Sequence, residues 1–585
     1  MVLPGGVEST AVAHYRSREG PIRGIVVLAG LLLLFRGGAP APGRAQTGPP
    51  PVAPAPGLTA AELAARVARF APVELAFDAA LLGPADRAVV RRLVEASDLI
   101  DEVFRLQVWR DNLAYRERLE VAADPGLDPA RAYYDIMAGP WDRLAGHAPF
   151  LDVDAKPAGA GFYPADATRE EIERWIAAHP EDERTFTSYY TLIGRHKDRL
   201  VAVPYHVAYA ERLERAAALL GEAAALAENP SLRDFLEKRA RSFLSDDYLA
   251  SEIAWIGLSG NLVDPTIGPY EVYEDGLMGW KAAFESFIGI RDPTASADLE
   301  LLVGRLRELE AALPMDDAYK RLNRSFASPL SVVDVIYTAG DARRGVTTLA
   351  FHLPNDPRVS EEHGTKKVML RNVIEAKFET VLTPIAARVL APELASGIEA
   401  RAFTTSVVMH ELAHGLGPRF VHGTEEPVSV RLGASYSPIE EAKADVVGAL
   451  SLAWLTGAGV YPPAFLRQVW ITSVAGLFRC VRFGIEEAHG RGCAVQLAHL
   501  LEAGAIAPGE DGRMEIDFDR IRPVYESLAR RLLTIEATGD VAGSEALLAS
   551  AGELAGPAAA LVARLGDVPV DIRPLYPVVE AMREW

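Results

Sequence analysis

Apolar residues recur at helical spacing through the first half of the chain, beginning just after Thr59. Thr59 and Glu62 form a capping-box pattern ahead of the apolar positions of residues 63–70. The same three- and four-residue spacing runs through residues 89–109, and a second Thr-x-x-Glu pattern begins at Thr168. Residues from Thr59 to about 256 are therefore predicted to be mostly helical.

The pattern changes in the middle of the chain. Residues 331–355 alternate, are rich in β-branched side chains and contain glycine breakers, which predicts a small sheet. The stretch that starts at Ile267 mixes strand-like and loop-like pieces. Beyond residue 366 the helical spacing returns, and long helices are predicted over residues 405–414, 437–457 and 486–504.

The order of these elements predicts a mainly α fold with a small β component, an α+β protein. A chain of 585 residues is too long for one hydrophobic core, so we expect two lobes around a substrate cleft. We assign residues 58–390, with the N-terminal helices and the small sheet, to a substrate-binding lobe. Residues 391–585 are predicted to form a helical catalytic lobe.

The N-terminus has the pattern of a targeting segment. Three arginines precede the uncharged, apolar stretch 24–35, and small residues follow it. The apolar stretch is shorter than the roughly 20 residues that span a bilayer. We therefore predict a secretory signal over residues 1–46, a Pro-rich linker over 47–57, and a periplasmic or secreted mature chain without stable membrane insertion. The alternative is a short membrane anchor that is not cleaved.

Charge and cysteine content narrow the possible partners and metals. The net charge of −20 argues against nucleic acid as a partner. Cys480 and Cys493 are the only cysteines, too few for a cysteine zinc site, so any metal must be held by histidines and carboxylates. Whether the two cysteines form a disulfide is left open, as is the oligomeric state.

Residues 410–414 read His-Glu-Leu-Ala-His, the pattern with most chemical content in the chain. Four residues apart on a helix, His410 and His414 lie on one face and can share a metal ion. Glu411 can then reach a water on that metal and act as general base. One zinc ion per chain is predicted, bound to the helical lobe.

A later glutamate must complete the ligand set and leave one position open for water. Ser437 and Glu440 read as a capping box, which gives Glu440 a structural explanation. Glu441 is therefore the predicted third ligand. Asp445, one turn further on, is predicted to accept a hydrogen bond from the far nitrogen of a ligand histidine, with Glu440 also beside the ligands.

The continuation found in metzincins, HExxHxxGxxH, does not fit this chain. Gly417 falls at the glycine position, but Phe420 occupies the position of the third histidine. His422 lies two residues late and is interpreted as a loop or rim histidine.

Five blocks in order along the chain resemble the dipeptidyl peptidase III family of zinc peptidases. They are IGPYEVY at 267–273, HLPN at 352–355, HELAHGLGPRF at 410–420, EEAKAD at 440–445 and EAHGRGCAVQLAHLLEAG at 487–504.

The resemblance agrees with zinc binding by the two histidines and Glu441, and with Glu411 as the base. It implies that Tyr273 and His489 stabilise the charge on the tetrahedral intermediate. It also implies that Glu271 and Asn355 hold the free α-amino group of the substrate. The expected activity is hydrolysis of short peptides with release of dipeptides from the N-terminus.

Two departures from the family pattern keep alternatives open. The metal helix has the five-residue HExxH form of some bacterial members instead of the usual HExxxH. His352 stands where the family usually has asparagine, so one amine-binding acceptor differs. The alternatives are a zinc oligopeptidase or other amide hydrolase without a dipeptide register, and a non-catalytic peptide-binding protein.

Overall fold

The computed structural model describes residues 52–197, 199–292, 301–322, 330–360, 362–485, 488–550, 554 and 556–585. The predicted signal segment, residues 1–46, and part of the linker lie outside these residues. Within the described ranges, no helix is long and apolar enough to cross a membrane.

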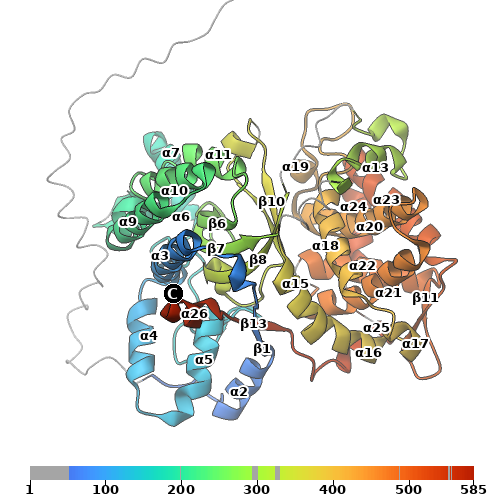
Figure 1. Ribbon diagram of the computed structural model, residues 1–585, viewed down its shortest axis with the longest axis horizontal. Coiled ribbons are helices and arrows are strands. Elements are labelled where there is room, and N and C mark those ends of the chain that lie inside the picture. The colour runs from blue at the N-terminus through green and yellow to red at the C-terminus, as the bar shows by residue number, and fades with distance from the viewer. Residues whose placement is uncertain are drawn as a thin grey trace, which may run out of the picture.

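The first half of the described chain is mainly helical, as predicted, and forms the left half of the molecule in Figure 1. Its longest helices, α3 (Pro84–Val108) and α9 (Ala210–Leu226), pack against each other. The other helices are α2 (Ala60–Ala68), α4 (Asn112–Val121), α5 (Asp128–Met137), α6 (Arg169–Ala178), α7 (Glu183–Phe186), α8 (Tyr205–Ala208), α10 (Pro230–Phe243) and α11 (Leu249–Ile256). Short strands are β1 (Phe70–Glu74), β2 (Trp141–Asp142), β3 (Ala148–Pro149), β4 (Thr191–His196) and β5 (Arg199–Pro204).

The two predicted caps of this region differ in the structure. The capping box of α2 is complete, since the Thr59 side chain and the Glu62 carboxylate each accept a hydrogen bond from the other residue's backbone N–H. In α6 the Thr168 side chain caps the helix, but the Glu171 carboxylate is paired with Arg195 at 2.7 Å. Arg195 thus binds the carboxylate that would otherwise complete the second capping box.

The predicted small sheet has five strands in the order β6-β7-β8-β10-β9. All neighbours are antiparallel except β8 and β10, and β9 is an edge strand. The packing of α3 against β7 and β8 explains why these two strands are buried almost throughout and read as apolar runs. The bounds are β6 (Val263–Glu271), β7 (Ala283–Arg291), β8 (Leu330–Gly340), β9 (Ala350–Leu353) and β10 (Lys366–Leu370).

The second half of the molecule is helical and lies on the right in Figure 1. Its core is built by α18 (Ala400–Ala413), α20 (Tyr436–Gly457), α21 (Pro463–Cys480), α22 (Ala488–Glu502) and α23 (Ile521–Thr538), which contact one another. Helix α13 (Leu306–Ala312) precedes β8. The other elements after β8 are α14 (Pro357–Ser360), α15 (Arg371–Lys377), α16 (Thr383–Val389), α17 (Pro392–Ala395), α19 (Val428–Leu432), β11 (Ile506–Pro508), β12 (Met514–Ile516), α24 (Val541–Ala549) and α25 (Gly556–Ala563).

The molecule therefore has two lobes, as predicted. We call the part with α2–α11 and the five-stranded sheet the sheet lobe, and the part with α16–α25 the helical lobe. The core of the helical lobe includes Leu302 and Leu390, while Ile572 and Val578 near the C-terminus belong to the core of the sheet lobe. The chain returns to the sheet lobe through β13 (Asp571–Leu575), parallel to β1, and α26 (Val578–Glu584). The predicted division at residue 390 remains a prediction.

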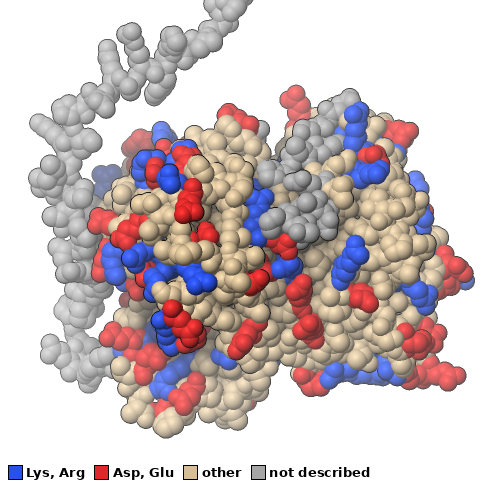
Figure 2. All heavy atoms as spheres, in the orientation of Figure 1, with Lys and Arg blue, Asp and Glu red and all other residues tan. Residues whose placement is uncertain are grey.

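Figure 2 shows acidic and basic side chains intermingled over both lobes on this face, without a stripe of one sign. The net charge of −20 is therefore not gathered into one strongly acidic patch on the visible surface.

Candidate active site

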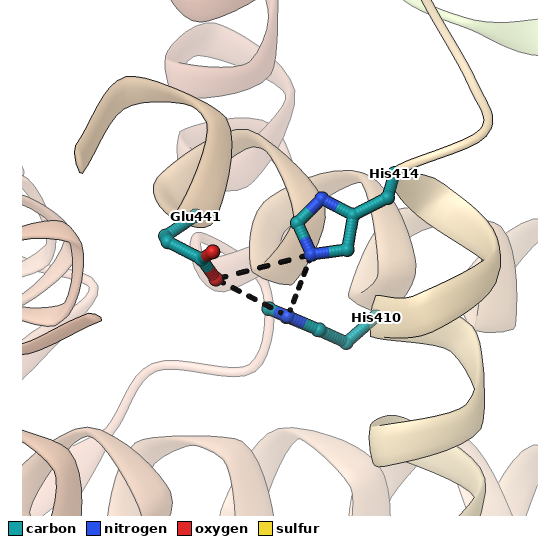
Figure 3. Close-up of side chains that lie close together, drawn as sticks. All are labelled: His410, His414 and Glu441. Atoms are coloured by element: carbon teal, nitrogen blue, oxygen red, sulfur yellow. Dashed lines mark hydrogen bonds and ion pairs between the residues drawn. The ribbon is translucent and has the colours of Figure 1, made fainter. Parts of the chain in front are cut away.

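Two helices of the helical lobe bring the predicted metal ligands together. His410 and His414 project from the end of α18, and Glu441 projects from the second turn of α20 (Figure 3). The Nε2 atoms of the two histidines are 3.1 Å apart, and Oε2 of Glu441 lies 3.3 Å from the first and 3.9 Å from the second. Among the described residues, this is the one group of three His, Cys, Asp or Glu side chains arranged to hold a metal ion.

Each ligand histidine is held by a carboxylate on its far nitrogen. Nδ1 of His410 lies 2.7 Å from Oδ1 of Asp445, as predicted, and Nδ1 of His414 lies 2.7 Å from Oε1 of Glu440. These contacts place the Nδ1 proton toward the carboxylates and leave both Nε2 lone pairs for a metal. Gln496, which the sequence did not single out, donates to the other oxygen of Asp445 at 2.9 Å.

The capping role predicted for Glu440 is wrong. Helix α20 begins at Tyr436, so Ser437 already lies inside it, and no side chain caps its N-terminus. The carboxylate of Glu440 instead contacts His414 and the buried Lys443. A histidine ring and an ammonium group in a buried site attract the carboxylate more strongly than backbone N–H groups at a helix end.

The site has the chemical features that a zinc ion requires. Oε2 of Glu441 is buried and accepts no well-formed hydrogen bond within the described structure, although imidazole nitrogens surround it. A buried anionic oxygen in that state is costly unless a cation binds it. Two neutral imidazoles and one carboxylate form a ligand set typical of catalytic zinc, and the residues present fit that ion.

Burial and hydrogen bonding set the charge on Asp445. Burial opposes ionisation of Asp445, but the hydrogen bond with His410 and the bond from Gln496 lower the pKa of the carboxyl below its ordinary value. Asp445 is therefore an anion that orients the imidazole.

Glu411 lies beside the metal ligands and reaches a cavity between the lobes. This cavity has a volume of about 580 Å³ and is lined by side chains of both lobes, including His410, Glu411 and His489. Lys367 on β10 donates a hydrogen bond to the backbone carbonyl of Glu411, so the sheet contacts the metal helix at this point. Burial lowers the pKa of Lys367 to about 8, against the opposing effect of the Glu411 charge.

His489 of the helical lobe lies beside the third metal ligand, and Tyr273 belongs to the sheet lobe. Nε2 of His489 on α22 lies 3.1 Å from Oε2 of Glu441, and its ring lies nearly parallel to that of His410 at 6.3 Å. Tyr273 follows β6 and is 76% exposed. The negative charge of Glu271, then burial and the charge of Glu441, raise the pKa of Tyr273 to about 12. Tyr273 is thus a phenol donor within electrostatic reach of the third ligand.

Glu271 and Asn355 also come together, at the end of the sheet next to Tyr273. Burial raises the pKa of Glu271, while a hydrogen bond from the side chain of Asn355 opposes that rise. Asn355 Nδ2 also donates to the carbonyl of Tyr270 at 3.3 Å. His352, on β9, contacts the Thr365 hydroxyl.

Two further carboxylates lie near Glu271. Glu285 on β7 and Asp341 after β8 are buried, and burial together with the charges of Glu271 and Asp341 raises the pKa of Glu285 well above its ordinary value. The signal for Glu285 was present in the sequence, as a lone acidic residue in an otherwise apolar strand. Glu271, Glu285 and Asp341 thus form a cluster of carboxylates, within which Asp341 is paired with Arg344.

His422 lies apart from the metal group, as predicted. Its ring packs edge-on against Tyr319 at 5.0 Å, and its backbone N–H bonds to Ala537. Phe420, at the metzincin histidine position, is 44% exposed.

A two-lobed, mainly helical protein with a His-Glu-x-x-His helix and a downstream glutamate ligand is a metallopeptidase in class. The model of Peptidase family M49 matches residues 168–450. The structure of DPP III from Caldithrix abyssi is 45% identical, with a TM-score of 0.87 over 88% of this chain and 99% of that one. Dipeptidyl-peptidase III from Corallococcus sp. strain EGB is 41% identical, with a TM-score of 0.81 over 90% and 99% of the chains. The chain belongs to peptidase family M49, the dipeptidyl peptidase III family.

Similar sequences occur in eukaryotes as well. The chain is 35% identical over 571 residues to a plant protein, Nudix hydrolase 3 of Arabidopsis thaliana. The matched region covers 88% of this chain and 74% of that protein. It is 27% identical over 398 residues to human dipeptidyl peptidase 3, covering 58% of this chain and 53% of the human protein.

Proposed function

We propose that the protein is a zinc-dependent peptidase that releases dipeptides from the free N-terminus of short peptides. The carrying observation is that a metal ligand, the proposed base and a proposed donor share one cavity. His410, Glu411 and His489 all line the cavity between the lobes, and His410 belongs to the metal group.

His410, His414 and Glu441 would hold the zinc ion, with Asp445 and Glu440 orienting the two imidazoles. When bound, zinc supplies Lewis-acid polarisation of the scissile carbonyl and lowers the pKa of a water. The remaining chemistry belongs to side chains of the chain itself.

Glu411 is proposed to accept the proton of the attacking water and to pass it to the leaving amine. Tyr273 and His489 are proposed to donate hydrogen bonds to the oxygen on which negative charge develops. Their opposite lobes support this assignment, because closure of the cleft around a peptide would bring both donors to one carbonyl and exclude water.

The free α-ammonium group is proposed to bind the carboxylate of Glu271 and the side-chain oxygen of Asn355. Edge strand β9 runs toward Asn355 and can pair with an extended peptide, as sheet edges do in peptide recognition. His352 on this strand stands where the family usually has asparagine. The carboxylate of Glu271 still supplies a negative charge for the α-ammonium group of the substrate.

The proposal on location rests on the sequence alone. The basic, apolar and small-residue segment over residues 1–46 supports export to the periplasm or outside the cell. N-terminal sequencing of the protein recovered from its native host tests this, and an intact N-terminus in the cytoplasmic fraction would contradict it.

The test of function compares peptides with a free and an N-acetylated terminus on zinc-loaded protein, with products identified by mass. Dipeptides from the free peptides and a strong loss of kcat/KM on acetylation are expected. Equal rates for both forms would reject the dipeptide register and leave an oligopeptidase. A metal analysis of the same sample should give one zinc per chain.

A further inference from the structure

The two cysteines of the chain come together beside the metal group. Cys480 is the last residue of α21, Cys493 lies in the second turn of α22, and their thiols are hydrogen-bonded to each other. Both are free thiols, and both line the cavity between the lobes. Because the sequence contains no other cysteine, an intramolecular disulfide can only join this pair.

Each thiol also contacts a group of the candidate active site. Sγ of Cys480 donates a hydrogen bond to the backbone carbonyl of His489 at 3.2 Å, and Sγ of Cys493 lies 3.8 Å from Oδ2 of Asp445. Cys493 lies four residues after His489 on α22, about one helical turn further along. A covalent bond between the two sulfurs would therefore act on the backbone that carries His489.

The two thiols differ in their access to reagents. Cys493 is 4% exposed, and burial, followed by the hydrogen bond with Cys480, raises the pKa of its thiol well above the ordinary value. Cys480 is half-buried and lies on the wall of the cavity. Since exposed thiols react before buried ones, a small disulfide that enters the cavity should react first with Cys480.

We propose that Cys480 and Cys493 form a thiol–disulfide switch, in which exchange with a small disulfide such as oxidised glutathione joins them and lowers peptidase activity by displacing His489. The effect on activity rests on the proposed function, because it uses the donor role of His489. Formation of the disulfide does not depend on that role.

The exchange proceeds in two balanced steps. The thiolate of Cys480 attacks one sulfur of oxidised glutathione, whose S–S bond breaks, and one glutathione thiolate leaves. The sulfur of Cys493 then attacks Sγ of Cys480, and the second glutathione thiolate leaves with the bonding electrons. The two glutathione thiolates take up the protons lost by the cysteines, so two protein thiols are oxidised and one oxidised glutathione is reduced.

The disulfide would change what holds His489 in place. Bonded sulfurs are about 2 Å apart with a restricted torsion angle, so the ends of α21 and α22 must adjust to a closer approach. Cys480 also loses the proton that it donates to the carbonyl of His489. A displacement of about 1 Å in a group that acts on the reacting atoms can reduce the rate about 100-fold.

The test treats zinc-loaded protein with oxidised glutathione and removes the reagent before measurement. Mass spectrometry without reductant should show the loss of two hydrogens and a link between the peptides that contain Cys480 and Cys493. The kcat for dipeptide release should fall about 10-fold or more, with zinc content unchanged. A phosphine reductant, which lacks the chelating thiols of dithiol reagents, should restore the rate.

Cys480→Ser and Cys493→Ser are the matched controls, because each leaves one thiol and puts a hydroxyl in place of the other. In Cys493→Ser the second step is blocked, so one glutathione should remain on Cys480. Cys480→Ser should take up little glutathione and lose little activity, because its remaining thiol is buried. Each variant is compared with its own rate before treatment.

The outcomes separate the switch from the proposed function. Wild-type protein that stays unmodified or retains glutathione overturns the switch, as does a complete disulfide with unchanged kcat or a loss of kcat that only follows loss of zinc. If the reduced, zinc-loaded protein releases no dipeptides, the proposed function fails, and the mass measurement still decides whether the pair forms a disulfide.

Discussion

The carboxylate of Glu440 lies 2.7 Å from Nδ1 of His414 and 2.8 Å from the ammonium group of Lys443. Burial opposes its ionisation, but the charge of Lys443 and the bond with His414 lower the pKa of Glu440 to about 2. Glu440 is therefore an anion that orients a metal ligand, and Glu440→Gln should remove that charge at nearly constant size. We expect zinc affinity to fall about 10–100-fold, measured by chelator competition.

Glu425→Gln provides the control for this charge change, because Glu425 is exposed on the loop after α18. It should keep wild-type zinc affinity. An unchanged affinity in Glu440→Gln would show that the contact with His414 does not support metal binding.

Glu411 is predicted to act on the water without binding the metal. Glu411→Gln should retain one zinc per chain and lose about 10²–10⁴-fold in kcat, the usual contribution of a general base. Mass spectrometry of the metal-loaded protein and steady-state kinetics measure the two effects separately. Full hydrolysis by a metal-replete Glu411→Gln sample would refute the mechanism.

Tyr273 is 76% exposed, so its hydroxyl contributes little to folding. Tyr273→Phe should reduce kcat about 10²–10³-fold, as loss of an oxyanion donor does, while KM and the unfolding temperature change little. A change confined to KM would assign Tyr273 to substrate binding instead.

Glu274 is buried and lies within 2.8 Å of Arg143 and 2.6 Å of Lys156. Burial opposes ionisation, but these two cations and Arg344 lower the pKa of Glu274 far below its ordinary value. Its stabilising contribution is therefore present above the unfolded pKa of about 4.3 and is lost as pH falls toward the folded pKa.

Glu274→Gln should lower the free energy of unfolding by roughly 3–5 kcal/mol at neutral pH, because it leaves buried cations without their anion. Denaturant unfolding at pH 7 and at successive pH values below 4 measures this difference. The difference in free energy of unfolding between variant and wild type should become smaller as the pH falls. A gap that stays constant with pH would contradict the pKa assigned to Glu274.

The sequence predicted the elements whose pattern is local. Strand β9 falls within the predicted stretch 331–355, β8 begins one residue before it, and the end of α20 at Gly457 matches the predicted helix end. His410 and His414 could be paired from spacing alone, since helix geometry fixes which side chains share a face.

The role of Glu440 could not be predicted in the same way. The local pattern offered its carboxylate a backbone N–H at the helix end. In the structure its partners are Lys443, three residues further along the same helix, and His414, which only the packing of α18 against α20 supplies. The same holds for Gln496, which reaches Asp445 from another helix.

The sequence by itself determined the metal helix, the types of metal ligand and the family pattern, because these depend on residue spacing and side-chain chemistry. The tertiary structure decided that the sheet and the metal helix meet at Lys367 and Glu411, and that side chains of both lobes line one cavity beside the metal ligands. Such relations depend on how the two lobes fold around separate cores, and contacts between residues far apart in the chain leave no periodic signal in it.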